Sequence, residues 1–138
     1  GWDLTNDSAY LKSIQAVDVE LGLMFDALKE TKGLSKEVAV ILTTDHGGGA
    51  PFKNHQGIPN IPVNITIPFV VWMEDFSAKD LYQLNKKGRK DPSIFNPTSK
   101  AKVQPIRNSD AANLCLQFLK LPPVAGSSVN PKQELKVQ

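Results

Sequence analysis

A short apolar run that leads straight into an Asp-His pair constrains this chain more than any other feature. Residues 38–43 are rich in β-branched side chains, and their apolar character is continuous up to Thr43. This pattern predicts a strand that is buried on both faces of a sheet. Asp45 and His46 follow directly. Because ligands bind to open α/β sheets beyond the carboxyl ends of the strands, the run predicts an α/β fold with a polar site at this strand end.

The residues that follow the strand are of the types that bind divalent metal ions. Asp45 offers carboxylate oxygens and His46 an imidazole nitrogen, and His55, nine positions further on, is the other of the chain's two histidines. Carboxylate and imidazole together suit zinc or a similar divalent ion. The glycines at 47–49 allow the backbone to pass close to a ligand in conformations that a Cβ would forbid. The pattern favours a metal site formed by Asp45, His46 and His55.

Other interpretations of these residues stay open. The glycines can form a simple turn, Asp45 can hydrogen-bond its own loop, and the histidines can lie on the surface. A P-loop is disfavoured because no Gly-Lys-Ser/Thr follows the glycines. A hydrolase triad is disfavoured because adjacent Asp and His cannot easily act as orienter and base, and the chain has no Gly-x-Ser-x-Gly elbow. A non-catalytic metal-binding module and a plain structural domain are further alternatives.

The order of the segments resembles the C-terminal part of alkaline phosphatase superfamily metalloenzymes. The matching segments are a helix with Tyr10-Leu11 at its start and Val17-Asp18 ahead of Gly22, the strand end Thr44-Asp45-His46-Gly47, His55, the run 64–72, and the stretches 104–114 and 121–127. The superfamily includes type I phosphodiesterases/nucleotide pyrophosphatases, sulfatases and cofactor-independent phosphoglycerate mutases. The last two stretches are similar to type I phosphodiesterase-like members, and the resemblance covers most of the chain.

The resemblance implies a fold, a cofactor and a reaction. The fold is α/β, part of a three-layer αβα sandwich with a mostly parallel sheet, and residues 1–138 form one domain of it. Asp45 and His46 would bind one metal ion and His55 the other, with two zinc ions expected and manganese or calcium possible. The paired ions would clamp both sides of a phosphoryl transfer, so we expect a hydrolase of small-molecule phosphate esters. Lys53 beside His55 keeps a sulfatase, which binds one ion, as the alternative.

The resemblance also implies what this chain lacks. In the superfamily the nucleophile, an early metal-binding Asp and an Asp-x-x-x-His pair precede the segments matched here, and no residues of this chain correspond to them. We therefore expect the chain to be the C-terminal portion of a longer enzyme, with these residues upstream of Gly1, and to be inactive alone. The resemblance favours a secreted, periplasmic or other extracytoplasmic location.

Local patterns predict the remaining elements. A helix is expected over about 7–31, N-capped by Asp7 or Ser8 and stopped by Gly33. Its apolar positions fall on one core-facing stripe, which consists of Leu11, Ile14, Val17, Leu21, Phe25 and Leu28. A second strand is expected over about 63–72, a short helix over 77–84, and a helix that Asn108 or Ser109 caps and that runs to about 119. The tail from 127 is expected to form an extended strap along the body, which can end in a strand at 135–137.

Composition limits the partners of the chain. A net charge of +2 gives no field that would argue for nucleic acid. The basic run 86–90 is expected to be a solvated loop, or else the rim of a cleft for an anionic substrate. No stretch has the length and apolarity of a membrane span. Cys115 is the single cysteine, so no internal disulfide can form, and its apolar neighbours predict a small buried side chain.

Overall fold

The computed structural model describes residues 5–49, 61–92 and 100–138. The chain forms two compact units. The first contains residues 1–38 and 46–66, and the second contains residues 39–45 and 67–138. The chain passes between the units three times, at 38–39, 45–46 and 66–67, so that Asp45 belongs to the second unit and His46 to the first.

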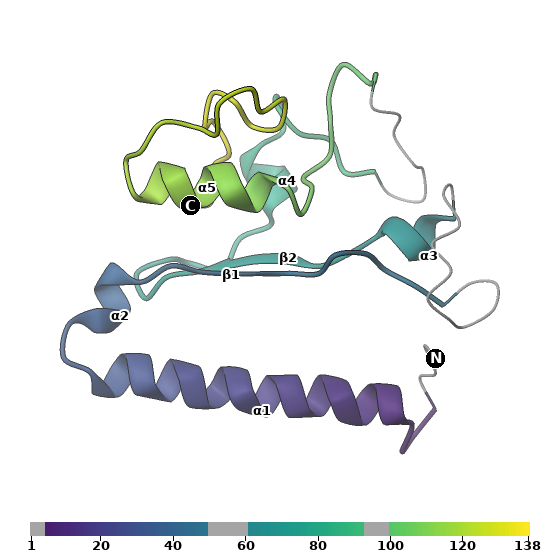
Figure 1. Ribbon diagram of the computed structural model, residues 1–138, viewed down its shortest axis with the longest axis vertical. Helices are drawn as coiled ribbons and strands as arrows, with labels where there is room; N and C mark the ends of the chain where they lie inside the picture. The colour runs from purple at the N-terminus through teal and green to yellow at the C-terminus, as the bar shows by residue number, and fades with distance from the viewer. Residues whose placement is uncertain (1–4, 50–60, 93–99) are drawn as a thin grey trace. The chain divides into compact units, whose positions relative to one another are not determined.

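The first unit begins with a long helix whose start is fixed by a serine. Helix α1 spans Ala9–Glu30, and the Ser8 hydroxyl accepts a hydrogen bond from Leu11 N–H at 3.2 Å. Ser8, rather than Asp7, is therefore the N-cap. The helix ends at Glu30 with Thr31 in an extended conformation as its C-cap, and Gly33, with a left-handed φ of 81°, is the N-cap of the next helix rather than the stop of α1. A short helix, α2, follows over Leu34–Glu37 (Figure 1).

The apolar stripe of α1 is only partly covered. Leu28 is buried, whereas the side chains of Ile14 and Val17 are 47% and 54% exposed. The prediction that the stripe faces a core is wrong for these two residues. The element of its own unit that packs on α1 is α2, which follows its carboxyl end, where Leu28 lies.

The second unit contains a two-stranded sheet. Strands β1 (Val40–Thr43) and β2 (Phe69–Trp72) pair antiparallel, with Val40 opposite Trp72 and Thr43 opposite Phe69. The described residues therefore contain an antiparallel pair and no parallel one. Neither strand is buried on both faces, since Leu42 is 37% and Val70 50% exposed, so the prediction of a fully buried first strand is wrong.

The second strand is shorter than predicted because proline shapes the residues that precede it. Residues Pro62–Ile65 form a short helix, α3, of the first unit, with proline at its first position, where the missing N–H costs nothing. Pro68 cannot donate to a ladder, and β2 begins directly after it. The carbonyl oxygen of Pro68 instead accepts a hydrogen bond from the Thr43 hydroxyl at 2.9 Å.

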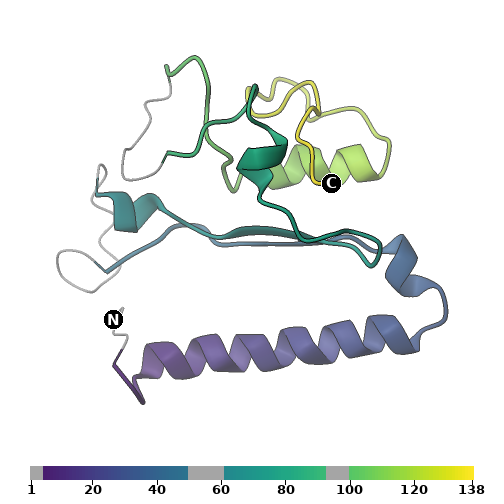
Figure 2. The same cartoon turned by 180° about the vertical axis from the view of Figure 1, so that it is seen from behind.

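The rest of the second unit consists of two helices and a long C-terminal segment. Helices α4 and α5 span Leu81–Leu84 and Asp110–Phe118. Both views show the C-terminal segment, drawn in yellow, lying beside α5 and α4 (Figures 1 and 2). The prediction that the tail lies as a strap along the body is confirmed within this unit. The tail is not extended throughout, because it bends and turns at 129–132 and Asn130 and Gln133 have left-handed φ values, and residues 135–137 form no strand.

Asparagine side chains attach this strap. The buried Asn113 amide donates to the Val129 carbonyl at 2.7 Å and its oxygen accepts from Val124 N–H at 2.8 Å. Asn85 donates to the Lys136 carbonyl at 2.7 Å and accepts from Lys136 N–H at 2.9 Å. One side-chain amide thus makes the two bonds that a neighbouring strand would make.

The interior of the second unit is small. Leu114 and Leu135 are 0% and 1% exposed, and they lie on α5 and on the strap. Cys115 is exposed, so the prediction that it is buried is wrong. The inward face of α5 carries Asp110, Asn113 and Leu114, and Cys115, the next residue, points elsewhere. None of the helices formed by the described residues has the length and apolarity of a membrane span.

Candidate metal centre

Asp45 lies at the carboxyl end of β1, as the sequence predicts. Asp45 is exposed, and its backbone is held by a side chain that is distant in the sequence. The Asn108 amide Nδ2 donates hydrogen bonds to the carbonyl oxygens of Thr44, at 3.2 Å, and Asp45, at 2.9 Å. Asn108 comes two residues before α5, so the start of this helix is attached to the loop that follows the strand.

His46 has a defined ring orientation in the first unit. Its Nδ1 lies 2.6 Å from the carbonyl oxygen of Gly47. A carbonyl can only accept, so Nδ1 carries the proton in this contact and the neutral ring has its lone pair on Nε2. Metal-binding histidines commonly donate one ring N–H to a carbonyl or carboxylate in this way, which sets the tautomer of the ligating nitrogen.

Gly47 packs against the backbone of α3, which is a reason for glycine besides the expected approach of a ligand. Its N–H donates to the Asn64 carbonyl at 2.9 Å. A Cβ at position 47 would overlap the carbonyl oxygen of Val63 and lie 2.9 Å from that of Thr66. Glycine is required here because protein backbone occupies the space of a side chain. Gly49 has a φ of 121°, a conformation that side-chain-bearing residues rarely adopt.

The third expected ligand, His55, lies outside the described residues. Within residues 5–49, 61–92 and 100–138, no three His, Cys, Asp or Glu side chains are close enough to hold a metal ion. The donor types of Asp45 and His46 nevertheless fit a divalent ion, because a carboxylate on an exposed residue and an imidazole that contacts a carbonyl through Nδ1 follow one another in the chain.

A buried ion pair supports the segment that carries Asn108. Asp110 is 0% exposed, and its carboxylate accepts from the Arg89 guanidinium at 2.5 Å and from Arg107 N–H at 2.8 Å. Burial raises the pKa of Asp110, an effect that the bond from Arg107 N–H and the charge of Arg89 oppose. Arg89 belongs to the basic run expected to be solvated. That expectation is wrong for Arg89 and correct for Lys86, Lys87 and Lys90, which are exposed.

A tyrosine joins this polar group. The Tyr82 hydroxyl accepts a hydrogen bond from Ile106 N–H at 3.3 Å. Burial raises the pKa of Tyr82; the bond from Ile106 lowers it, and the nearby carboxylates of Asp91 and Asp110 raise it further. The neutral phenol is therefore the form that the fold favours.

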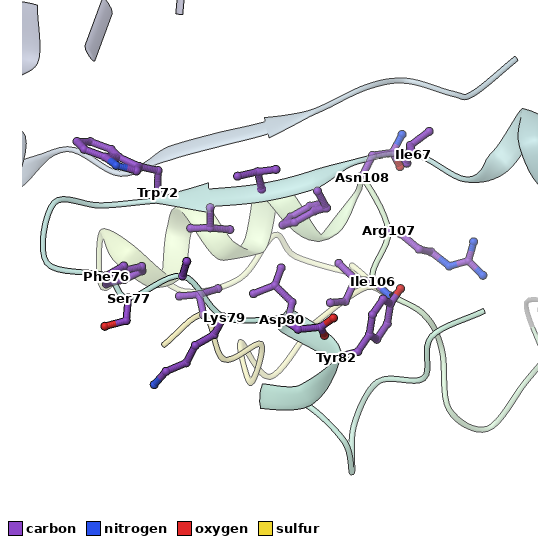
Figure 3. Close-up of a pocket in the computed structure, with 16 residues that line it drawn as sticks. Ile67, Trp72, Phe76, Ser77, Lys79, Asp80, Tyr82, Ile106, Arg107 and Asn108 are labelled. Atoms are coloured by element: carbon purple, nitrogen blue, oxygen red, sulfur yellow. Dashed lines mark hydrogen bonds between the residues drawn. The ribbon is translucent and has the colours of Figure 1, made fainter. Parts of the chain in front are cut away.

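A cavity of about 500 Å³ lies along β2 in the second unit. Figure 3 shows Trp72 and Phe76 at one end and Ile67, Arg107 and Asn108 at the other. Asn108 thus borders the cavity while it holds the carbonyls of Thr44 and Asp45. The walls are mostly apolar and the polar groups are few, which is the usual composition of a small-molecule pocket.

Asn108 has a role that the sequence does not predict, because its side chain holds the carbonyls of Thr44 and Asp45. We expected Asn108 or Ser109 to cap the last helix. Ser109 stands at the N-cap position without a side-chain bond to the helix, and Asn108 Oδ1 accepts Ser109 N–H at 2.8 Å. The cluster of polar residues at 108–110 is a signal for a helix start, but nothing local in the sequence points to a partner sixty-three residues away.

A mixed α/β fold with an Asp-His-Gly loop directly after a strand is consistent with the phosphoester hydrolases of the alkaline phosphatase superfamily, and comparison with known families gives this assignment. The chain belongs to the type I phosphodiesterase / nucleotide pyrophosphatase family, whose model matches residues 1–115. The match includes β1, the Asp-His pair, β2 and most of α5. No curated protein and no solved structure gives a significant match.

Proposed function

We propose that this chain supplies Asp45, His46 and His55 to the two-metal centre of a phosphodiesterase-type hydrolase. The observation that carries the proposal is the family membership of residues 1–115, which include all three side chains. The place of the exposed residue Asp45 after β1 and the Nδ1–carbonyl contact of His46 support it. Zinc is the ion that this donor set suits best.

The metal ions would supply Lewis-acid stabilisation of charge on the phosphoryl oxygens. Within the proposal, Asp45 and His46 bind one ion and His55 the other. The residues of this chain would then hold the ions in place, while the β1–β2 pair would form part of a larger, mostly parallel sheet in a three-layer αβα sandwich. The antiparallel pair of the second unit is compatible with such a sheet, because mixed sheets are common in α/β folds.

The cavity along β2 is suited to the organic group of an ester. Its aromatic walls include Phe69 and Phe76, and it ends at Asn108, which holds the backbone of Asp45. An ester whose phosphate lay near Asp45 would direct its apolar group into this cavity, where about 0.025 kcal/mol is gained for each square ångström of apolar surface that leaves water.

Metal titration tests the proposal directly. Zn²⁺ is added to the 138-residue chain and to its Asp45→Ala, His46→Ala and His55→Ala variants, and binding is followed by the backbone amide NMR signals of residues 47–49 and by elemental analysis after dialysis. We expect each variant to weaken binding at least tenfold at one ion, because a ligand is lost. Unchanged binding in Asp45→Ala and His46→Ala would contradict the ligand assignment. Binding of a single ion by the unmutated full-length protein would instead favour the sulfatase alternative.

A further inference from the structure

Both peptide groups that flank Asp45 are held by one side chain. The Thr44 carbonyl belongs to the peptide that precedes Asp45, and the Asp45 carbonyl belongs to the peptide that follows it. Asn108 Nδ2 donates to both, at 3.2 and 2.9 Å. Fixing the two peptide planes fixes φ and ψ of the residue between them, and therefore the direction of its Cα–Cβ bond. The clamp sets where the Asp45 carboxylate can point.

Asn108 is itself held in place. Its Oδ1 accepts Ser109 N–H at 2.8 Å, which fixes the amide orientation so that Nδ2 faces the two carbonyls. The neighbouring residue, Arg107, donates its backbone N–H to the buried Asp110 carboxylate, and that carboxylate is paired with Arg89. The donor thus stands on a segment anchored to a buried ion pair rather than on a free loop.

We propose that Asn108 is a positioning residue of the metal centre, which orients Asp45 through its backbone without binding the ion. This inference rests on the proposed function of Asp45 as a metal ligand. Side chains that orient ligands contribute about 10- to 100-fold to metal affinity. Asn108 differs from the usual case because it acts on the ligand's backbone and not on its ligating group.

The chain offers a matched control for the experiment. Asn85 Nδ2 also donates to two carbonyls, those of Leu81 at 2.8 Å and Lys136 at 2.7 Å, and Asn85 is as much a part of the second unit as Asn108. Its removal detaches the C-terminal strap from α4 and leaves the Asp45 loop untouched. Asn85→Ala and Asn108→Ala therefore each remove an amide that bridges two carbonyls, but only one of the two bridges touches the metal loop.

The test is a Zn²⁺ titration of the 138-residue chain and its variants, followed by the amide signals of residues 47–49, with urea unfolding of each protein measured in parallel. We expect Asn108→Ala to raise the Kd for Zn²⁺ about tenfold or more, and Asn85→Ala to leave it unchanged despite an equal or larger loss of stability. Asn108→Ser keeps an acceptor for Ser109 N–H but is too short to reach the carbonyls, so it should behave like Asn108→Ala.

The outcomes separate this inference from the function on which it rests. If Asp45→Ala leaves Zn²⁺ binding unchanged, the metal function fails and the positioning role fails with it. If Asp45→Ala abolishes binding at one ion but Asn108→Ala binds Zn²⁺ as the unmutated chain does, the metal function stands and the positioning role is overturned. A Kd that rises equally in Asn108→Ala and Asn85→Ala would also overturn it, because the effect would then follow stability.

Discussion

At the scale of single residues, the glycine after the Asp-His pair shows how closely the loop after β1 packs against the segment 62–66. Gly47 packs against the carbonyls of Val63 and Thr66, and its own N–H is bonded to Asn64. From the sequence alone, glycine at this position is expected to let the backbone pass close to a ligand. The structure gives a second reason, the close approach of α3, and the two reasons make different predictions for a substitution.

We expect Gly47→Ala to destabilise the chain, because its Cβ would overlap a backbone oxygen that cannot rotate away. Overpacking of this kind costs about 1–3 kcal/mol. Gly22→Ala is the matched control, because no atom lies within 4 Å of a Cβ at that helical position. It should stabilise α1 by up to about 1 kcal/mol. Urea unfolding of both variants measures the difference, and equal stability of the two would show that α3 yields freely.

A second residue-scale prediction concerns the alkaline limit of stability. Burial raises the pKa of Tyr82, so folding favours the neutral phenol. This contribution to stability is complete below the ordinary tyrosine pKa, near 10, and is lost as the pH rises through the higher pKa of the folded state. Tyr82→Phe removes the titrating group and should flatten the fall in stability above pH 10.

The same variant has an expected cost at neutral pH. Ile106 N–H loses its acceptor, which should lower the free energy of unfolding by about 1 kcal/mol. Chemical denaturation at several pH values between 7 and 11 gives both numbers, with the lysines present equally in both proteins. A parallel decline of the two curves above pH 10 would contradict the assignment of the alkaline sensitivity to Tyr82.

At the scale of elements, α5 is held by buried polar contacts as well as by apolar ones. Its inward face carries Asp110 and Asn113 beside Leu114. Asp110 fixes the approach to the helix through Arg89 and Arg107, and Asn113 fixes the strap that follows. Because buried polar groups are costly unless each has its partners, the position of this helix depends on a few specific bonds.

We expect Asp110→Ala to lower the free energy of unfolding by about 3–5 kcal/mol, because it leaves the Arg89 charge largely buried and unpaired. Replacing both partners, as Arg89→Met with Asp110→Leu, should lower it by much less, since no uncompensated charge remains. Urea denaturation of the single and double variants measures the coupling. Additive losses in the double variant would show that Arg89 and Asp110 do not act as a pair.

The elements that sequence could predict are those decided locally. The Ser8 cap starts α1 as expected, and the helix ends at Glu30, one residue before the predicted end, with Thr31 rather than Gly33 as its C-cap. Asp45 follows β1 as predicted. By contrast, the second strand was predicted over 63–72 but spans only Phe69–Trp72, because Pro62 starts a helix and Pro68 cannot join a ladder. Local patterns predict helix caps and strand breaks, but they do not show whether two prolines outweigh the strand-like composition of the residues between them.

The contacts that sequence could not predict join distant segments. The carbonyls held by Asn108 lie more than sixty positions away, and Arg89 finds its carboxylate at a separation of twenty-one residues. The apolar neighbours of Cys115 predict a buried side chain, whereas α5 turns Asp110 inward and leaves Cys115 exposed. Such pairings depend on tertiary packing that local composition does not encode.

At the scale of the whole molecule, the number of ligands limits what the chain can do. Its two histidines and Asp45 are the side chains that the family resemblance assigns to metal. Shared between two ions, three side chains leave each ion with at most two protein ligands, fewer than the three or four of ordinary zinc sites. The resemblance also assigns the role of nucleophile to none of these residues.

We therefore expect the 138-residue chain to bind Zn²⁺ weakly and to show no metal-dependent turnover. The assay incubates the purified chain with an aryl phosphate, an aryl phosphodiester and an aryl sulfate, each with Zn²⁺ or Mn²⁺, and compares release of the phenol with metal alone. Rates should not exceed those of His46→Ala, because the resemblance assigns to this chain only three of the metal ligands and no nucleophile. Turnover well above the metal background that His46→Ala abolishes would contradict this ligand count, and would show that other side chains of the chain complete the centre.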